Sequence, residues 1–190
     1  MIFNGEMVRA ILDGGKTQTR RPVKVPHIDR DAMCELSGNE LAGELSAGNY
    51  RNSPHGKPGD RIWVRETWAR YNIDQDSHDM AYRATPPADW PEEGRWRPSI
   101  HMPRWASRLM LEITGVRVER LQAITLGDVC KEIGCGLYDF RPATYGFQVW
   151  EDLWKSIYGE ENWQANPWVW VIEFKVVPNV PANSTGSGLR

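Results

Sequence analysis

Hydrophobic and polar residues alternate in two long segments of the chain, which is the pattern of a half-buried strand. Within residues 167–177, one face of an extended chain carries a row of large apolar side chains: Trp168, Trp170, Ile172, Phe174 and Val176. Within residues 109–120, Val116 and Val118 alternate with charged residues, and Gly115 interrupts the segment. We therefore expect two strands here, the first of them irregular at Gly115.

A third segment of this kind follows a Pro-Gly turn at residues 58–59. Residues 61–68 are rich in β-branched and aromatic side chains, as strands are. Alternation places Glu66 on the same face as three apolar residues, Ile62, Val64 and Trp68. A carboxylate in such surroundings needs a partner or a raised pKa. A structural ion pair and a functional role are therefore both open for Glu66.

Apolar residues at helical spacing predict three helices. The first covers residues 5–13 and ends at two glycines, Gly14 and Gly15. The second begins after Thr125, runs through Glu132 and ends near Gly134. The third covers residues 144–158, where one predicted face carries Phe147, Trp150, Leu153, Trp154 and Ile157.

The order of these elements favours an α+β fold with a small curved β-barrel and two to three flanking α-helices, because strands and helices do not alternate regularly. We also expect a short strand at 81–85. Residues 26–57 are rich in Gly, Asn, Ser and charge, so we expect a long loop insertion there. We expect one domain over residues 1–177 and a disordered tail over 178–190.

Composition and charge limit the cellular compartment and the binding partners that we expect for this domain. The 190 residues carry a net charge of −2 and include ten Trp, and no apolar run approaches the roughly 20 residues of a membrane span. Three cysteines are too few for a disulfide scaffold, which favours a reducing cytoplasm. Cys130 and Cys135 lack the spacing of a zinc pair, so we expect neither metal nor cofactor. We also expect a monomer, and any nucleic-acid contact must use a local basic patch.

Two polar segments are candidates for binding. Residues 16–21 (KTQTRR) combine three cations with two hydroxyls, and in an extended chain Lys16 and Arg20 share a face opposite Thr19. This segment suits a phosphate or carboxylate partner, or it is a solvated basic turn. Residues 96–108 interleave Arg and Trp, as do segments that stack bases and contact phosphate. The alternative is that Trp105 and its neighbours only anchor a loop.

Five segments of the chain resemble the ASCH-domain proteins of the PUA-like superfamily, and most closely their small phage and prophage members. They are residues 11–22 (ILDGGKTQTRRP), 58–68 (PGDRIWVRETW), 97–108 (RPSIHMPRWASR), 111–116 (LEITGV) and 166–174 (NPWVWVIEF). The resemblance implies a PUA-like barrel with a cleft for RNA or a nucleotide. Some small ASCH proteins are amidohydrolases that deacetylate N4-acetylcytidine, and the resemblance implies Lys16, Thr19 and Glu132 as the catalytic group.

The remaining candidates are expected to bind substrate around that cleft. They are Arg20, Arg21, Arg65, Glu66, Trp68, Tyr82, Arg104 and Trp105, of which the aromatic residues would stack a pyrimidine. Three functions stay open: an amidohydrolase acting on an N4-acylated cytidine, a non-catalytic module that binds RNA or a modified nucleoside, and a phage-linked accessory protein that serves mainly in protein interactions. The enzymatic hypothesis predicts that Lys16, Thr19 and Glu132 converge within hydrogen-bond reach.

Overall fold

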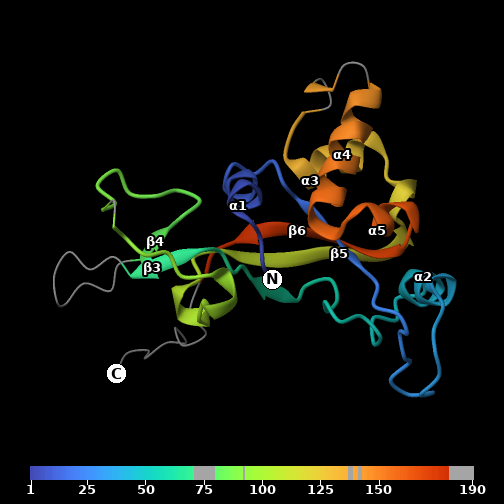
Figure 1. Ribbon diagram of the computed structural model, residues 1–190. Helices are drawn as coiled ribbons and strands as arrows, with labels where there is room; N and C mark the ends of the chain where they lie inside the picture. Colours follow the sequence, from blue (N-terminus) through green and yellow to red (C-terminus); the bar gives the residue numbers. More distant parts are fainter. Residues whose placement is uncertain (71–79, 92, 137–138, 141–142, 180–190) are drawn as a thin grey trace, which may run out of the picture.

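The computed structural model describes residues 1–70, 80–91, 93–136, 139–140 and 143–179 (Figure 1). Its centre is a curled, four-stranded antiparallel sheet with the strand order β1-β6-β5-β2. The strands are β1 (Gln18–Pro22), β2 (Arg61–Trp63), β5 (Met110–Arg120) and β6 (Trp168–Val177). The described residues thus form a mixed α+β fold around an open, curved sheet.

The two long predicted strands, β5 and β6, are confirmed, and they pair along their whole length. Their register runs from Met110 opposite Val177 to Arg120 opposite Trp168. The register shifts between Ile113 and Gly115, where the sequence predicts an irregularity. A bulge of this kind adds one residue to a strand and bends it, which contributes to the curl of the sheet.

The single strand predicted over residues 61–68 is wrong, because the chain passes there from one sheet to another. After β2 ends at Trp63, a new strand, β3 (Trp68–Arg70), pairs with β4 (Met80–Tyr82) in a separate two-stranded sheet. Between them, Arg65 hydrogen-bonds to the first residues of the chain instead. The predicted alternation of buried positions still holds, since it is a local property. The strand predicted at 81–85 is shorter, since a turn follows Tyr82.

Five α-helices lie in the described ranges, where the sequence predicts two or three. Three match the predictions: α1 (Gly5–Leu12), α3 (Leu126–Ile133) and α4 (Ala143–Tyr158). The other two, α2 (Gly38–Ser46) and α5 (Glu160–Gln164), were not predicted. In Figure 1, α3, α4 and α5 lie together on one side of the sheet, and α2 lies apart from them near the end of β5.

Helix α2 falls inside residues 26–57, so the prediction of a long loop there is wrong for its middle part. The helix begins with a capping box in which Ser37 and Glu40 satisfy each other's backbone N–H groups. Leu41 and Leu45, one turn apart, are buried in the core beneath the sheet. Both signals are present in the sequence, but the surrounding Gly, Asn and Ser residues conceal so short a helix.

The face predicted for α4 is only partly buried. Trp150 and Trp154 lie in a core cluster with residues of α3 and β6 and with Leu121, which directly follows β5. Phe147 and Ile157, at the two ends of the predicted stripe, are 41% and 46% exposed. The helix therefore packs through its centre, and Ile157 remains at the surface beside α1.

The C-terminal segment is ordered at its start. Asn179 is held in place, because its side chain donates to the carbonyl of Ser107 and accepts from Arg104. The rest of the predicted tail, residues 180–190, lies outside the described residues. Among the residues that are described, no helix has both the length and the apolar character needed to cross a membrane.

Candidate functional site

Two glycines bring the loop after α1 onto the end of α3. Gly14 ends the helix with φ of +77°, and Gly15 lies so close to Gly134 that a Cβ on it would be 2.6 Å from the Gly134 carbonyl oxygen. The backbone N–H of Lys16 donates to Ala10 in α1, and that of Thr17 donates to Lys131 in α3. These contacts position Lys16 against the last turn of α3.

Lys16 is buried, with 1% of its surface exposed, and its amine is fully engaged. Nζ donates to the Gln18 carbonyl at 2.8 Å, to the Glu132 carbonyl, and to Glu132 Oε2 at 3.1 Å. Burial lowers the pKa of Lys16, and the neighbouring Glu132 carboxylate only partly opposes that shift. Lys16 thus combines a favourable partner with an environment that disfavours its charge.

The Glu132 carboxylate lies between two buried cations. Its Oε2 accepts from Lys16, and its Oε1 accepts from Arg20 Nη1 at 3.1 Å. Arg20 also pairs with Glu119 and, at 3.5 Å, with Asp128. One donor of this guanidinium, the buried Nε, has no hydrogen-bond partner among the described residues. Arg20 therefore retains one donor for a ligand.

A chain of ion pairs joins this buried cluster to the surface. Arg117 contacts Glu119, Glu173 and Asp128. Although burial alone would raise the pKa of Asp128, Arg117 and Arg20 together hold it below its ordinary value. Asp128 and Arg117 are not among the site residues predicted from the sequence, although Asp128 lies one helical turn before Glu132 and shares its face.

Thr19 lies close to Glu132, but no hydrogen bond links it to the Lys16–Glu132 pair. It is 2% exposed and lines a small chamber together with Arg20 and Glu132. Within the described part of the chain, its hydroxyl bonds to neither Lys16 nor Glu132. The chamber has a volume of about 10 Å³, which is room for one water molecule at most.

An open groove lies directly outside the chamber. It has a volume of about 430 Å³ and is lined by Ile2, Asn4, Met7, Arg21 and Ile157. Three of these residues, Met7, Arg21 and Ile157, also line the chamber. Arg21 is held across the groove by a hydrogen bond to the Ile2 carbonyl at 2.9 Å. The groove between α1 and α4 is therefore the outer compartment of the site, and side chains of Met7 and Ile157 separate it from the inner one.

The other predicted binding residues lie elsewhere, around the β3–β4 sheet. Glu66 is 2% exposed and accepts a bidentate pair from Arg108 at 2.8 and 2.9 Å. This is the structural ion pair that its apolar face predicts as one of two alternatives. Tyr82 packs under Arg108 at 4.1 Å and donates to the Ala106 carbonyl, and burial raises its pKa.

The predicted aromatic and basic residues of this region differ in exposure. Trp68 is 2% exposed, so its predicted role in stacking a pyrimidine does not fit the structure. Trp105 is 60% exposed and contacts Trp68 edge to face at 5.9 Å. Arg65 lies over the Trp63 ring at 4.5 Å, and Arg104 bonds to Asn179. The structure therefore separates the predicted site residues into two regions.

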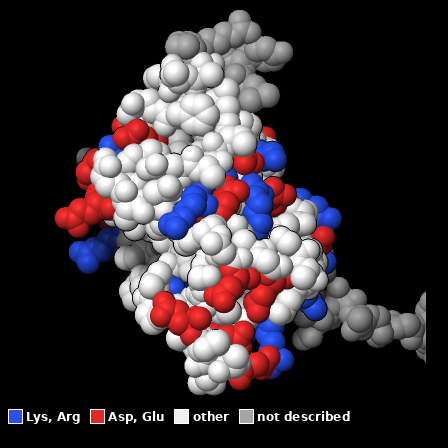
Figure 2. Space-filling model, turned by 90° about the vertical axis from the view of Figure 1, so that its right-hand side faces the viewer, with Lys and Arg blue, Asp and Glu red and all other residues white. Residues whose placement is uncertain are grey.

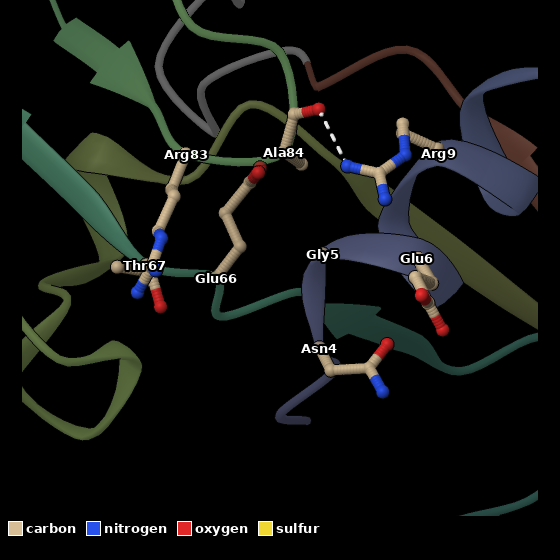
Figure 3. Close-up of a pocket in the computed structure, with 8 residues that line it drawn as sticks. All are labelled: Asn4, Gly5, Glu6, Arg9, Glu66, Thr67, Arg83 and Ala84. Carbon is tan, nitrogen blue, oxygen red and sulfur yellow. Dashed lines mark hydrogen bonds between the residues drawn. The ribbon is translucent and has the colours of Figure 1, made fainter.

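A separate cavity of about 530 Å³ lies between the first turn of α1 and the residues leading into and out of the β3–β4 sheet (Figure 3). Arg9 and Arg83 stand on opposite sides of it, and Glu66 lies between them (Figure 3). Arg9 is fixed by a hydrogen bond to the Ala84 carbonyl at 3.0 Å. Neither Lys16 nor Glu132 lines this cavity, so it is not part of the chamber site.

Comparison of the chain with protein-family models, with curated proteins and with solved structures finds no match. Within the described ranges, no three His, Cys, Asp or Glu side chains are grouped as a metal ion requires. The case for a function therefore depends on the site geometry and on the sequence motifs.

Proposed function

We propose that this chain is a PUA-like, ASCH-type protein that hydrolyses the amide of an N4-acylated cytidine, such as N4-acetylcytidine. The observation that carries the proposal is the buried Lys16–Glu132 pair at 3.1 Å, beside a chamber that Thr19 lines. The motifs at residues 11–22 and the curled antiparallel sheet with flanking helices also support it.

Each of these residues suits one step of amide hydrolysis. The Thr19 oxygen bonds to the acyl carbonyl carbon while its proton passes to the amine form of Lys16, which a lowered pKa makes more accessible. The carbon–nitrogen bond then breaks, and Lys16 returns the proton to the departing N4 amine of cytidine. Water cleaves the acyl ester on Thr19, releasing the carboxylic acid and restoring the hydroxyl. Glu132 orients Lys16 throughout.

The unpartnered donor of Arg20 suits the charge that develops in this reaction. Attack on the carbonyl creates an oxyanion, and preorganised buried donors stabilise such a charge more effectively than water does. Arg20 lines the chamber, is 2% exposed and keeps its Nε without a partner in the described ranges. We assign it the role of the oxyanion donor.

The size of the two compartments defines how a substrate would enter. A chamber of about 10 Å³ does not admit a nucleoside, whereas the outer groove of about 430 Å³ is within the range of small-molecule sites. The proposal therefore places the nucleoside in the groove. Its acyl group reaches Thr19 when the side chains of Met7 and Ile157 move aside.

The test is the release of cytidine from N4-acetylcytidine by the purified protein, followed by chromatography. Thr19→Val keeps the shape of the side chain and removes the hydroxyl, and we expect it to lower kcat by about 1,000-fold or more. Thr17→Val is the matched control, because Thr17 contributes only backbone hydrogen bonds to this region. Circular dichroism verifies that both variants are folded.

Two results would contradict the proposal. Full activity of Thr19→Val would remove Thr19 as the nucleophile. Absence of turnover by the folded wild-type protein would remove the hydrolase function, and retention of N4-acetylcytidine without turnover would then favour a binding module.

A further inference from the structure

The aromatic and basic residues around the β3–β4 sheet form a surface that the proposed hydrolysis does not use. Trp105 is 60% exposed, although Met102 before it and Ala106 after it in the chain are both buried. Tyr82 donates to the Ala106 carbonyl at 2.9 Å, and Ser107 donates to the Val64 carbonyl at 2.8 Å. The short turn Arg104–Ala106 is thus fixed at both ends. Trp105 is held outward by the fold.

Two arginines flank this exposed ring system. The Arg70 guanidinium lies 5.6 Å from the centre of the Trp105 ring, and that of Arg97 lies 5.3 Å from the centre of the Trp68 ring. Trp68 in turn supports Trp105 from beneath. Both arginines are exposed, and within the described ranges neither pairs with a carboxylate.

Some other cations of the described residues are paired with carboxylates. Lys155 pairs with Glu151 and Glu160, and Lys175 pairs with Glu112. The face that carries α2, α4 and α5 shows acidic side chains gathered in its lower half (Figure 2), and α2 and the loop before it expose Asp31, Glu35 and Glu40. The lower half of that face is therefore less favourable for a polyanion than the surface around Trp105, where Arg70 and Arg97 have no carboxylate partner within the described ranges.

We propose that Trp105, Arg70 and Arg97 form a contact surface for single-stranded nucleic acid. A base stacks on the exposed part of the Trp105 ring, and the phosphates next to it contact the two guanidiniums. Because the ring is fixed in advance, little side-chain freedom is lost on binding. A duplex does not fit this surface in the same way, since its bases are already stacked on each other.

The test is fluorescence anisotropy with a labelled oligouridine of about twelve nucleotides. We expect Trp105→Ala to weaken binding about five- to 150-fold and Trp105→Phe to restore most of it. Arg70→Gln combined with Arg97→Gln is expected to reduce the slope of log K against log salt by about 1.4, since each lost single-strand phosphate contact removes about 0.7. Oligothymidine is expected to bind as tightly as oligouridine, because neither the stacking on Trp105 nor the phosphate contacts involve the sugar.

The matched control is Arg120→Gln, which removes an exposed arginine that lies 4.5 Å from the Trp168 ring, outside the β3–β4 region. The proposal is overturned if Trp105→Ala binds as the wild type does, if Arg120→Gln weakens binding as much as the double variant, or if a duplex of equal length binds as tightly as the single strand. Oligouridine carries no acylated amine, so these results do not depend on whether the protein is a hydrolase.

Discussion

Replacing Glu132 by Gln tests whether the buried charge cluster is arranged as described. The side chains of Lys16 and Arg20 are 0% exposed, and Glu132 is the carboxylate that both of them share. Gln has the same shape but no charge, and its amide N–H groups face one of the two cations. The substitution therefore leaves two buried cations with too little compensating negative charge.

The expected loss follows from the lack of solvent at this position. Removing one partner of a buried ion pair costs about 3–5 kcal/mol, because the remaining charge stays desolvated. For a chain of this length, each kcal/mol lowers Tm by about 2–4 °C, so we expect a decrease of about 6–20 °C. Lys16→Met added to Glu132→Gln removes one stranded cation, and we expect this double variant to be more stable than Glu132→Gln by about 1 kcal/mol or more.

Urea unfolding, followed by circular dichroism and tryptophan fluorescence, measures these differences. The control is Glu160→Gln, which breaks an exposed pair with Lys155 and is expected to cost less than about 1 kcal/mol. The stability of Glu132→Gln is also expected to depend on pH. Burial already lowers the folded-state pKa of Lys16 below 10.5, and the variant removes the group that opposes this shift. The unfolded state then binds more protons, so stability of the variant rises as the pH increases toward 10.5.

Two results would refute this reasoning: a loss below about 1 kcal/mol in Glu132→Gln, or a double variant no more stable than the single one. Either would mean that the cluster is open to water or uncharged.

Two further predictions concern stability. Gly15→Ala places a Cβ 2.6 Å from the Gly134 carbonyl oxygen and is expected to destabilise the protein by about 1–3 kcal/mol. Gly43→Ala, at an open position inside α2, is its control and is expected to stabilise by up to about 1 kcal/mol in the same urea titration. A loss at both positions, or at neither, would contradict the close approach at Gly15. Burial lowers the pKa of His55 from 6.5 to about 4. Between these values the unfolded state takes up the proton first, so stability falls as the pH decreases. Between pH 7 and pH 5, we expect Tm to fall further for the wild type than for His55→Gln. Equal decreases in Tm would refute the lowered pKa of His55.

Elements whose signals are local can be predicted from the sequence. The alternation in β5, the interruption at Gly115, the cap at Thr125 and the stop at Gly134 all depend on neighbouring residues, and the structure contains each of them. The one-sided burial predicted for β6 is wrong, because both faces are buried over residues 169–172 and Val176 is 47% exposed. Helix α2 also has a local signal in Ser37 and Glu40, which the polar composition around it concealed. Strand alternation and helix caps can be predicted because backbone geometry and capping involve residues only a few positions apart.

The distribution of charged and aromatic surface depends on contacts between distant parts of the chain. Glu66 meets Arg108, 42 residues away, and Glu132 meets Arg20, 112 residues away. Trp68 and Trp105 both lie in Arg-rich segments, yet one is buried and the other exposed. The free energy of burying a charge or a ring depends on what the rest of the chain places around it. No pattern along the sequence contains that information, which is why a single predicted site becomes a buried chamber and a separate surface.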